Sequence, residues 1–259
     1  MIRSFIRSTL LLVTASFLAV APASAGPFKM VVDKKPLSGY LAEPKGAGTH
    51  PAIVVIHQWW GLNDWVKEQS DSLAAHGYIA LAVDLYKGKV ANDQETAHQL
   101  MSGLDDDEAI ATLRRAADFL RTRDDVRAQA IGVIGWCMGG KYSIRLAAAD
   151  PGIRACVMYY GAPITDPVSI KGIQAAVLGN FGGDDKGPTP EQALEFEKAL
   201  RAAGKKVDFK IYPGAGHAFA DINNPWGGYR AEAAKDAWAR TVAFLDENLR
   251  KPSLPKKRG

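Results

Sequence analysis

The fold is indicated most clearly by one stretch, Ala130-Ile131-Gly132-Val133-Ile134-Gly135-Trp136-Cys137-Met138-Gly139-Gly140. It starts as a short apolar strand and continues as a helix from Gly139. Cys137 lies between them, with glycines two residues before and two residues after it. This is the G-x-S-x-G pattern of a nucleophile elbow, with Cys in place of Ser. The glycines remove Cβ atoms that would clash where strand and helix approach each other.

An elbow of this kind favours a reactive thiol. The sulfur of Cys137 would sit at a helix N-terminus, where unpaired amides and the helix dipole favour the thiolate. The backbone amide of Met138 would be placed to bind an oxyanion. The alternative is a buried core cysteine beside packing glycines, and the strand-to-helix context favours the elbow.

Strand-like and helical runs alternate along the rest of the chain, without a repeat or a low-complexity linker. This alternation predicts one α/β domain over residues 26–250, a mostly parallel sheet with helices on both faces. The expected strands are Phe28–Val32, Leu37–Leu41, Ala52–Ile56, Tyr78–Val83, Ala130–Ile134, Ala155–Tyr160, Gln174–Phe181 and Val207–Tyr212. The expected helices are Trp65–Ala75, Gln94–Met101, Glu108–Arg121, Gly139–Ala149, Glu191–Ala203 and Tyr229–Leu249.

A general base is expected in a loop at the carboxyl end of a strand, where sites form in such sheets. His217 lies on the Gly-rich loop after the last expected strand, which fits. His50 precedes a strand, and His76 and His98 lie at or in helices. His57 ends a strand and is a candidate for a supporting place behind the site.

A carboxylate that orients the base is expected in the loop before it, Phe181-Gly182-Gly183-Asp184-Asp185-Lys186. Either Asp184 or Asp185 could accept a hydrogen bond from the His217 ring and fix its tautomer. The order Cys137, Asp185, His217 is that of nucleophile, acid and base in α/β-hydrolases. Three separate loops that agree in this order are a stronger signal than any one of them.

The loop after the third strand, Ile56-His57-Gln58-Trp59-Trp60-Gly61-Leu62-Asn63, is expected to complete the site. In α/β-hydrolases the second oxyanion amide comes from this loop, which makes the amide of Trp59 the candidate. Trp59 and Trp60 would also wall the pocket, although core packing explains Trp60 equally well.

Five motifs resemble the dienelactone hydrolase family, in order and spacing, over nearly all of residues 26–250. They are His57-Gln58-Trp59-Trp60-Gly61-Leu62-Asn63, Asp84-Leu85-Tyr86, Gly135-Trp136-Cys137-Met138-Gly139-Gly140, Phe181-Gly182-Gly183-Asp184-Asp185 and Pro213-Gly214-Ala215-Gly216-His217-Ala218-Phe219. The resemblance implies an α/β-hydrolase fold, a Cys–Asp–His triad with Asp185 as its acid, and no metal or cofactor.

Two departures from the family pattern bear on the substrate. Gln58 stands where the best-known members carry a Glu that holds the resting thiol, and Gln58 cannot take up a proton. Gly88 and Asp221 stand where those members use arginines for a substrate carboxylate. An acid at the second position would repel a carboxylate, so the sequence predicts hydrolysis of an ester or lactone but leaves open whether dienelactone is accepted.

The two cysteines are not expected to form a disulfide. Cys137 lies past the carboxyl end of its strand and Cys156 near the start of the next one. Four or five residues at ~3.3 Å rise separate them by roughly 15 Å, whereas a disulfide needs Cα atoms within about 7 Å. Two cysteines and five histidines are also too few for a Cys-rich zinc module.

The N-terminal residues 1–25 have the pattern of a secretory signal peptide: Arg3 and Arg7, an apolar run over residues 8–20, then Ala23-Ser24-Ala25. The apolar run is shorter than the roughly 20 residues of a membrane-spanning helix. We expect cleavage after Ala25 and a periplasmic or secreted protein, without membrane contact after cleavage.

Charge gives no support for nucleic-acid binding. The net charge is +4, and the expected signal carries two arginines and no acid, so its removal leaves +2. Four further cations lie in the basic tail 251–259, which leaves the domain near neutral. The sequence favours a monomeric thiol hydrolase acting on a small ester or lactone. The alternative is a hydrolase-like binding protein without turnover, and a redox-sensing thiol ranks last.

Overall fold

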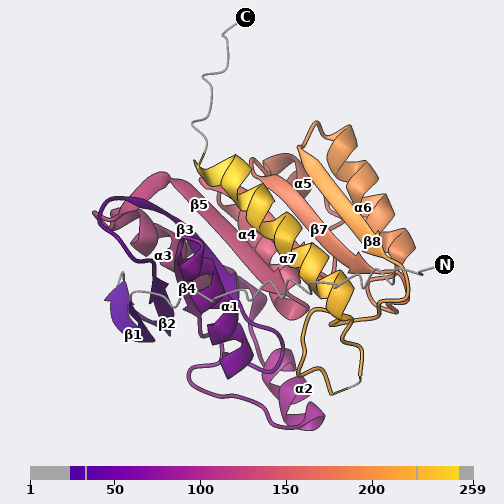
Figure 1. The fold of residues 1–259 in the computed structure, drawn as a ribbon, viewed down its shortest axis with the longest axis horizontal. Coiled ribbons are helices and arrows are strands. Elements are labelled where there is room, and N and C mark those ends of the chain that lie inside the picture. Colours follow the sequence, from indigo (N-terminus) through magenta and orange to yellow (C-terminus); the bar gives the residue numbers. More distant parts are fainter. Residues whose placement is uncertain (1–23, 33, 226, 251–259) are drawn as a thin grey trace, which may run out of the picture.

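The computed structural model describes residues 24–32, 34–225 and 227–250, in which eight strands form one sheet (Figure 1). Its order is β1-β2-β4-β3-β5-β6-β7-β8. The strands are β1 Ser24–Val32, β2 Lys35–Glu43, β3 His50–Ile56, β4 Ile79–Val83, β5 Val126–Trp136, β6 Ile153–Tyr159, β7 Ala176–Gly182 and β8 Val207–Tyr212. The helices are α1 Asp64–Ala75, α2 Gln94–Ser102, α3 Asp106–Thr122, α4 Met138–Ala149, α5 Pro167–Gly172, α6 Pro190–Ala202 and α7 Ala231–Leu245, which a π-helical turn follows, Asp246–Arg250.

The expected α/β fold with a mostly parallel sheet is confirmed. Strands β3 to β8 pair in parallel, while β1 with β2 and β2 with β4 pair antiparallel. From β3 the chain first adds β4 on one side and then crosses over to add β5 on the other. The strand order therefore reverses between β3 and β5, and ligand sites in open α/β sheets form at such a point, beyond the carboxyl ends of the strands.

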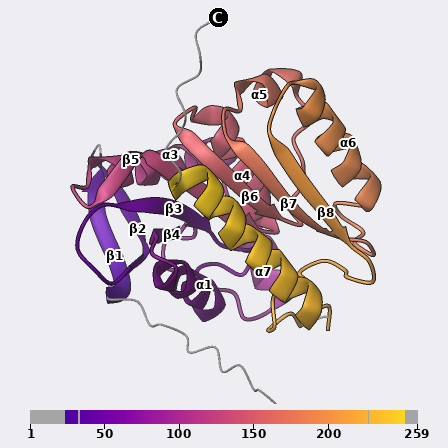
Figure 2. The ribbon, with the colours of Figure 1, turned by 45° about the horizontal axis from the view of Figure 1, so that its top comes forward.

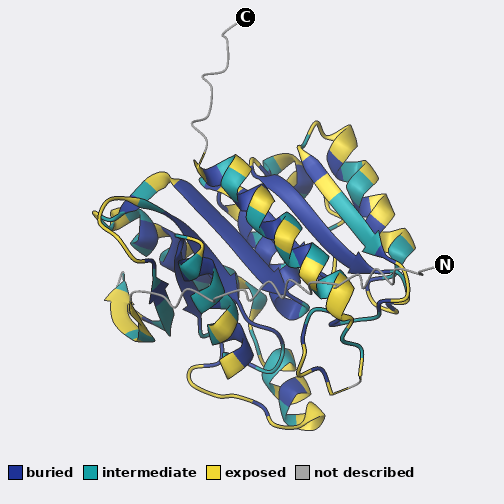
Figure 3. Cartoon of the chain, in the orientation of Figure 1, coloured by how far each residue is buried: buried dark blue, intermediate teal, exposed yellow. Residues whose placement is uncertain are grey.

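Helices cover both faces of the sheet, as the continuous apolar strands predict. Along β3, Val54 and Ile56 belong to the core that α3, α4, α5 and α6 cover. Ile53 and Val55 belong to the core under α1 and α7. Figures 1 and 2 show α1 and α7 on one face, and Figure 3 shows the central strands buried between the layers. Each such Val or Ile stabilises the fold by about 1.5–3 kcal/mol on burial.

The expected elements differ from the observed ones at their ends and in one helix. The last helix was expected to run to Leu249, but its regular part ends at Leu245 and a π-helical turn follows. The short helix α5 was not predicted, although Asp166 caps it and Pro167 stands at its first position. Tyr160 was assigned to a strand, yet it follows β6 with a φ of 37°.

Most of the expected signal peptide lies outside the described residues, as does the basic tail 251–259. Of residues 1–25 only Ser24 and Ala25 are described, and they begin β1 opposite Glu43 and Ala42. Within the described ranges, no helix combines the length and apolar character needed to cross a membrane.

Helix α4 lies against the backbone of the sheet because two glycines open its first turn. A Cβ on Gly139 would lie 2.2 Å from the carbonyl oxygen of Ile56, and one on Gly140 would lie 2.8 Å from that of Tyr159. Real Cβ atoms do not approach backbone this closely, so only glycine fits at either position. The glycines singled out in the sequence thus set how deeply α4 sits on β3 and β6.

Gly139→Ala should lower the free energy of unfolding by about 2 kcal/mol or more, because the new methyl group must push α4 away from β3. Urea unfolding followed by tryptophan fluorescence measures this. Gly187→Ala is the matched control, since a Cβ there meets nothing within 4 Å. A Gly139→Ala protein as stable as this control would contradict the close approach.

Candidate functional site

Cys137 occupies a sharp turn between β5 and α4. Its φ of 55° and ψ of −117° lie in a region that non-glycine residues rarely adopt, and its N–H donates to the Tyr159 carbonyl over 3.0 Å. Such a backbone persists only where the surroundings impose it. A Cβ on Gly135 would lie 2.3 Å from the Gly139 carbonyl oxygen, so the first glycine of the motif is required as well as Gly139. The turn holds Cys137 at the N-terminus of α4 with its side chain partly exposed.

His217 and Asp185 form a hydrogen-bonded pair on the loops after β8 and β7. Nδ1 of His217 lies 2.9 Å from Oδ2 of Asp185, whose side chain is 1% exposed. Oδ1 of Asp185 accepts the N–H of Gly187 over 2.9 Å. The carboxylate is thus held from both sides and aimed at the imidazole.

The charges around His217 favour its protonated form. Burial lowers the pKa of the imidazole, but its hydrogen bonds to Asp185 and Cys137, together with their negative charges, outweigh this and raise the pKa to about 10. At neutral pH an imidazolium therefore lies between a carboxylate and a sulfur.

Asp184 and Asp185 were equivalent by spacing, and the structure separates them. Asp184 is exposed, and its backbone N–H donates to the Ala215 carbonyl. Asp185 is buried and contacts His217. The structure thus brings Cys137, Asp185 and His217 together at the carboxyl edge of the sheet.

The loop after β3 lies against the first turn of α4. A Cβ on Gly139 would meet the carbonyl oxygens of Ile56 and His57, so the segment carrying Trp59 adjoins the one carrying Met138. The rings of Trp59 and Trp60 lie 5.0 Å apart at 60°. Both indoles are half-buried. The two amides expected to bind an oxyanion therefore lie on neighbouring segments.

Gln58 and Asp221, the two departures from the family pattern, contact each other. Nε2 of Gln58 donates to Oδ2 of Asp221 over 2.8 Å, and both residues are 2% exposed. Oδ1 of Asp221 accepts the N–H of Asn223. Burial raises the pKa of Asp221. The loop after β3 thus places Gln58 against a buried acid, Asp221, which is hydrogen-bonded to this amide rather than to a cation.

His57 is fully buried and links two loops of the site. Its Nδ1–H donates to the Gln58 carbonyl over 2.6 Å, and its Nε2 accepts the N–H of Leu85 over 3.2 Å. Burial lowers the pKa of its ring, so it is neutral at pH 7. It therefore braces the loop after β3 against the loop after β4.

Two tyrosines of the site were not named as site residues from the sequence. The hydroxyl of Tyr86 donates to the sulfur of Met138 over 3.2 Å. The ring of Tyr160 packs edge-on against His217 at 5.2 Å, and its buried hydroxyl has no hydrogen-bond partner among the described residues. Both follow the ends of parallel strands, β4 and β6, and this position was the available signal.

The structure places Cys156 away from the site. It is fully buried in β6 and pairs with Val133 of β5, which lies four residues before Cys137 in the sequence. Both thiols are free. Burial raises the pKa of the Cys156 thiol. The expected absence of a disulfide between these cysteines is confirmed. The described residues contain no group of three or more His, Cys, Asp and Glu that could hold a metal ion.

Known proteins show the same fold and much of the same sequence. The model of the dienelactone hydrolase family matches residues 37–249. A Methylorubrum extorquens protein named "Putative carboxymethylenebutenolidase" is 34% identical over 230 residues, 83% of this chain and 78% of that protein. "Protein usf" of Aquifex pyrophilus is 33% identical over 223 residues, 82% of this chain and 93% of its own. The crystal structure named "Putative Dienelactone Hydrolase" from Klebsiella pneumoniae has a TM-score of 0.79 at 27% identity and covers 86% of this chain and 98% of its own.

The stability of the protein should fall as the pH rises from about 7 to about 10. Folded His217 keeps its proton up to a pKa of about 10, whereas an unfolded histidine loses it near 6.5, so the stabilisation present below pH 6.5 is lost over this range. Urea unfolding at intervals of pH measures the slope. His217→Gln should flatten it, and His98→Gln, a change of an exposed histidine on α2, should not. Equal slopes in all three proteins would contradict the raised pKa.

Proposed function

Because this chain belongs to the dienelactone hydrolase family, whose relatives are named as hydrolases of ester and lactone bonds, we propose that it cleaves its substrate through a thioester on Cys137. The observation that carries the proposal is the 2.9 Å contact of His217 with the buried Asp185, beside a cysteine held on a strained elbow. The roles of Cys137, Asp185 and His217 are those of nucleophile, orienting acid and proton carrier.

The first half of the reaction forms the thioester. The Cys137 thiolate attacks the carbonyl carbon, and the amides of Met138 and Trp59 hold the oxyanion. When the tetrahedral intermediate collapses, the bond from carbon to the leaving oxygen breaks. The alkoxide then takes the proton of the His217 imidazolium and leaves as the alcohol, or stays attached where the substrate is a lactone.

The second half restores the thiolate. Neutral His217 accepts a proton from a water molecule, whose oxygen attacks the thioester carbon. The carbon–sulfur bond breaks, the acid product leaves, and the imidazolium and thiolate are regenerated. Asp185 holds the ring in the tautomer that both halves need, and its charge stabilises the imidazolium.

The hydrogen-bonded pair of Gln58 and Asp221 bears on the choice of substrate. Gln58 donates to Asp221 and cannot exchange a proton with Cys137. A carboxylate next to Asp221 would be repelled by that acid or would have to force a proton onto it. We therefore propose that the substrate is an ester or lactone that presents a neutral group to Gln58 and Asp221. We also propose that the reaction uses no cofactor.

Cys137→Ala should abolish the hydrolysis of 4-nitrophenyl acetate, because the attacking sulfur is gone. Asp185→Asn should lower kcat by roughly 10²- to 10⁴-fold with a small change in KM, since the ring of His217 loses its orienting charge. Stopped-flow or steady-state absorbance of nitrophenolate measures both.

Matched controls come from the neighbouring residues. Asp184→Asn alters an exposed acid one residue away, and Cys156→Ala removes the buried thiol, so both should keep the wild-type kcat. Full turnover in the Cys137→Ala protein, or equal losses in the two Asp variants, would reject the mechanism. A binding protein without turnover would release no alcohol at all.

We further propose that the protein is exported and acts as a monomer. Removal of 25 of the 259 residues leaves 234, and cleavage after Ala25 takes away only the first two, exposed residues of β1. Mass spectrometry of protein recovered from the periplasm or the medium after expression in a bacterium should find a chain that begins at Gly26. A full-length chain recovered only from the cytoplasm would reject export.

A further inference from the structure

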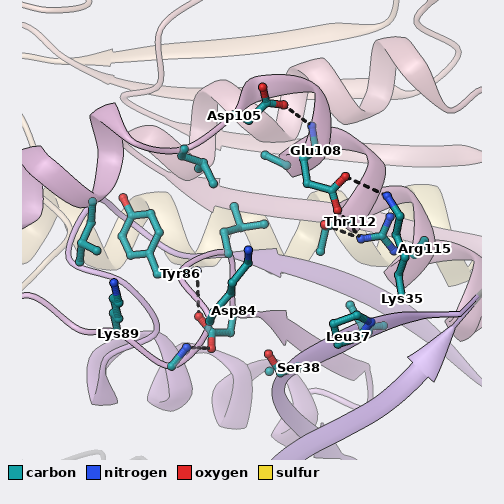
Figure 4. Close-up of a pocket in the computed structure, with 18 of the residues that line it drawn as sticks. Lys35, Leu37, Ser38, Asp84, Tyr86, Lys89, Asp105, Glu108, Thr112 and Arg115 are labelled. Carbon is teal, nitrogen blue, oxygen red and sulfur yellow. Dashed lines mark hydrogen bonds and ion pairs between the residues drawn. The ribbon is translucent and has the colours of Figure 1, made fainter.

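A cavity of about 900 Å³ is lined in part by Tyr86 and other residues of the loop after β4 (Figure 4). Its walls are the β1–β2 hairpin, the loop after β4, and the segment from the end of α2 to the middle of α3. Cys137 and His217 do not line it. Its volume is that of a pocket for a small molecule. Nothing in the hydrolysis mechanism uses this cavity.

The cavity opens at the same edge of the sheet as the catalytic residues. Gly39 of β2 pairs with Val83 at the carboxyl end of β4. Strand β4 is two places from β5, which is about 10 Å at ~4.8 Å per strand. Tyr86 links the two regions, because it lines the cavity and its hydroxyl donates to Met138, next to Cys137. A substrate bound at Cys137 could therefore extend past Tyr86 into the cavity.

The lining combines apolar and basic side chains. Its apolar members include Phe28, Leu37, Leu100, Leu104 and Ala109, and its basic members are Lys29, Lys35, Lys87, Lys89 and Arg115. The three acids that line it are already engaged. Asp84 accepts the amides of Tyr86 and Gly88, Asp105 accepts the amide of Glu108, and Glu108 pairs with Lys35 and Arg115. The cavity thus favours an apolar ligand that carries a negative charge.

The end of the cavity farthest from Tyr86 carries a partly unsatisfied cation. Figure 4 shows Tyr86 and Lys89 at one end and Lys35 and Arg115 at the other. The Arg115 side chain is 11% exposed, and its Nη2 contacts Glu108 and Thr112. Its Nε is buried and has no hydrogen-bond acceptor among the described residues. Two cations here share the single carboxylate of Glu108, so an anion could be bound at this end.

We propose that this cavity holds the distal part of the substrate, an apolar chain that ends in a carboxylate bound by Arg115 and Lys35. The proposal rests on the hydrolysis at Cys137 put forward above. It places the negative charge of the substrate away from the buried acid of Asp221, on the β2 side of Tyr86. The substrate class is then an ester or lactone with an extended acidic arm.

The test compares 4-nitrophenyl monoesters of succinic, adipic, suberic and sebacic acid with the same compounds capped as methyl esters. We expect kcat/KM to favour the free acid by about tenfold or more at the chain length that reaches Arg115, and not at the shortest length. Arg115→Met keeps the apolar stem without the charge, so the ratio of acid to methyl ester should fall to about one. Arg114→Met alters the exposed arginine beside it and should keep the wild-type ratio.

A second variant covers the case in which Arg115→Met does not fold. Leu104→Trp would fill part of the cavity, and it should lower kcat/KM for the sebacate ester more than for the succinate ester. Ratios near one at every chain length in the wild-type protein would overturn the proposal. An equal loss of the acid preference in Arg114→Met and Arg115→Met would also overturn it.

Calorimetry with sebacate, which needs no turnover, separates this proposal from the mechanism at Cys137. If none of the esters is cleaved, the hydrolysis mechanism fails. The cavity proposal then stands only if sebacate binds to the wild-type protein and at least tenfold more weakly to Arg115→Met. If the esters are cleaved without preference and sebacate does not bind, the cavity proposal fails alone.

Discussion

The contact of α4 with the backbone of β3 and β6 is the constraint on which the rest of the site depends. This contact exists because Gly135, Gly139 and Gly140 carry no side chain. A Cβ at any of these positions would overlap neighbouring backbone atoms. The chain must then turn from β5 into α4 within one residue, which forces Cys137 to a positive φ. The burial of the two apolar cores supplies the free energy that holds this strained residue in place.

Once Cys137 is fixed, the proposed chemistry depends on the 2.9 Å pairing of Asp185 with His217 on two other loops. Asp185 and His217 lie after neighbouring parallel strands, β7 and β8, so their side chains meet without any long excursion of the chain. The hydrogen bonds of His217 to Asp185 and Cys137, together with the charges of these groups, raise the pKa of His217 although its ring is largely buried. At His57 the effect of burial outweighs the hydrogen bond to the Gln58 carbonyl and the charge of Asp84, so the pKa of that ring is lowered.

Most of the fold, and Cys137 and His217 as candidate catalytic residues, could be predicted from the sequence because their signals are local. The apolar run of β3, the Gly-x-Cys-x-Gly turn and the Gly-rich loop around His217 each constrain the backbone within a few residues. The contacts of Tyr86 and Tyr160 could not be predicted, since they depend on how segments distant in the sequence pack. The choice between Asp184 and Asp185 was also beyond the pattern of residues alone, because it depends on the direction in which one loop turns. Helix α5 has only six residues, too few for a periodic pattern.

The two departures from the family pattern, Gln58 and Asp221, can be explained together. A buried acid such as Asp221 needs a donor, and the Gln58 amide supplies one within 2.8 Å, whereas a Glu in place of Gln58 would add a second negative charge. The buried acid of Asp221 also makes the region around Gln58 and Asp221 unfavourable for an anionic substrate group. The basic side chains around the cavity lie instead beyond Tyr86, toward β2, and its acids are already hydrogen-bonded or ion-paired. A substrate with both a reactive carbonyl and a carboxylate can therefore satisfy both regions only if it is long enough to pass Tyr86.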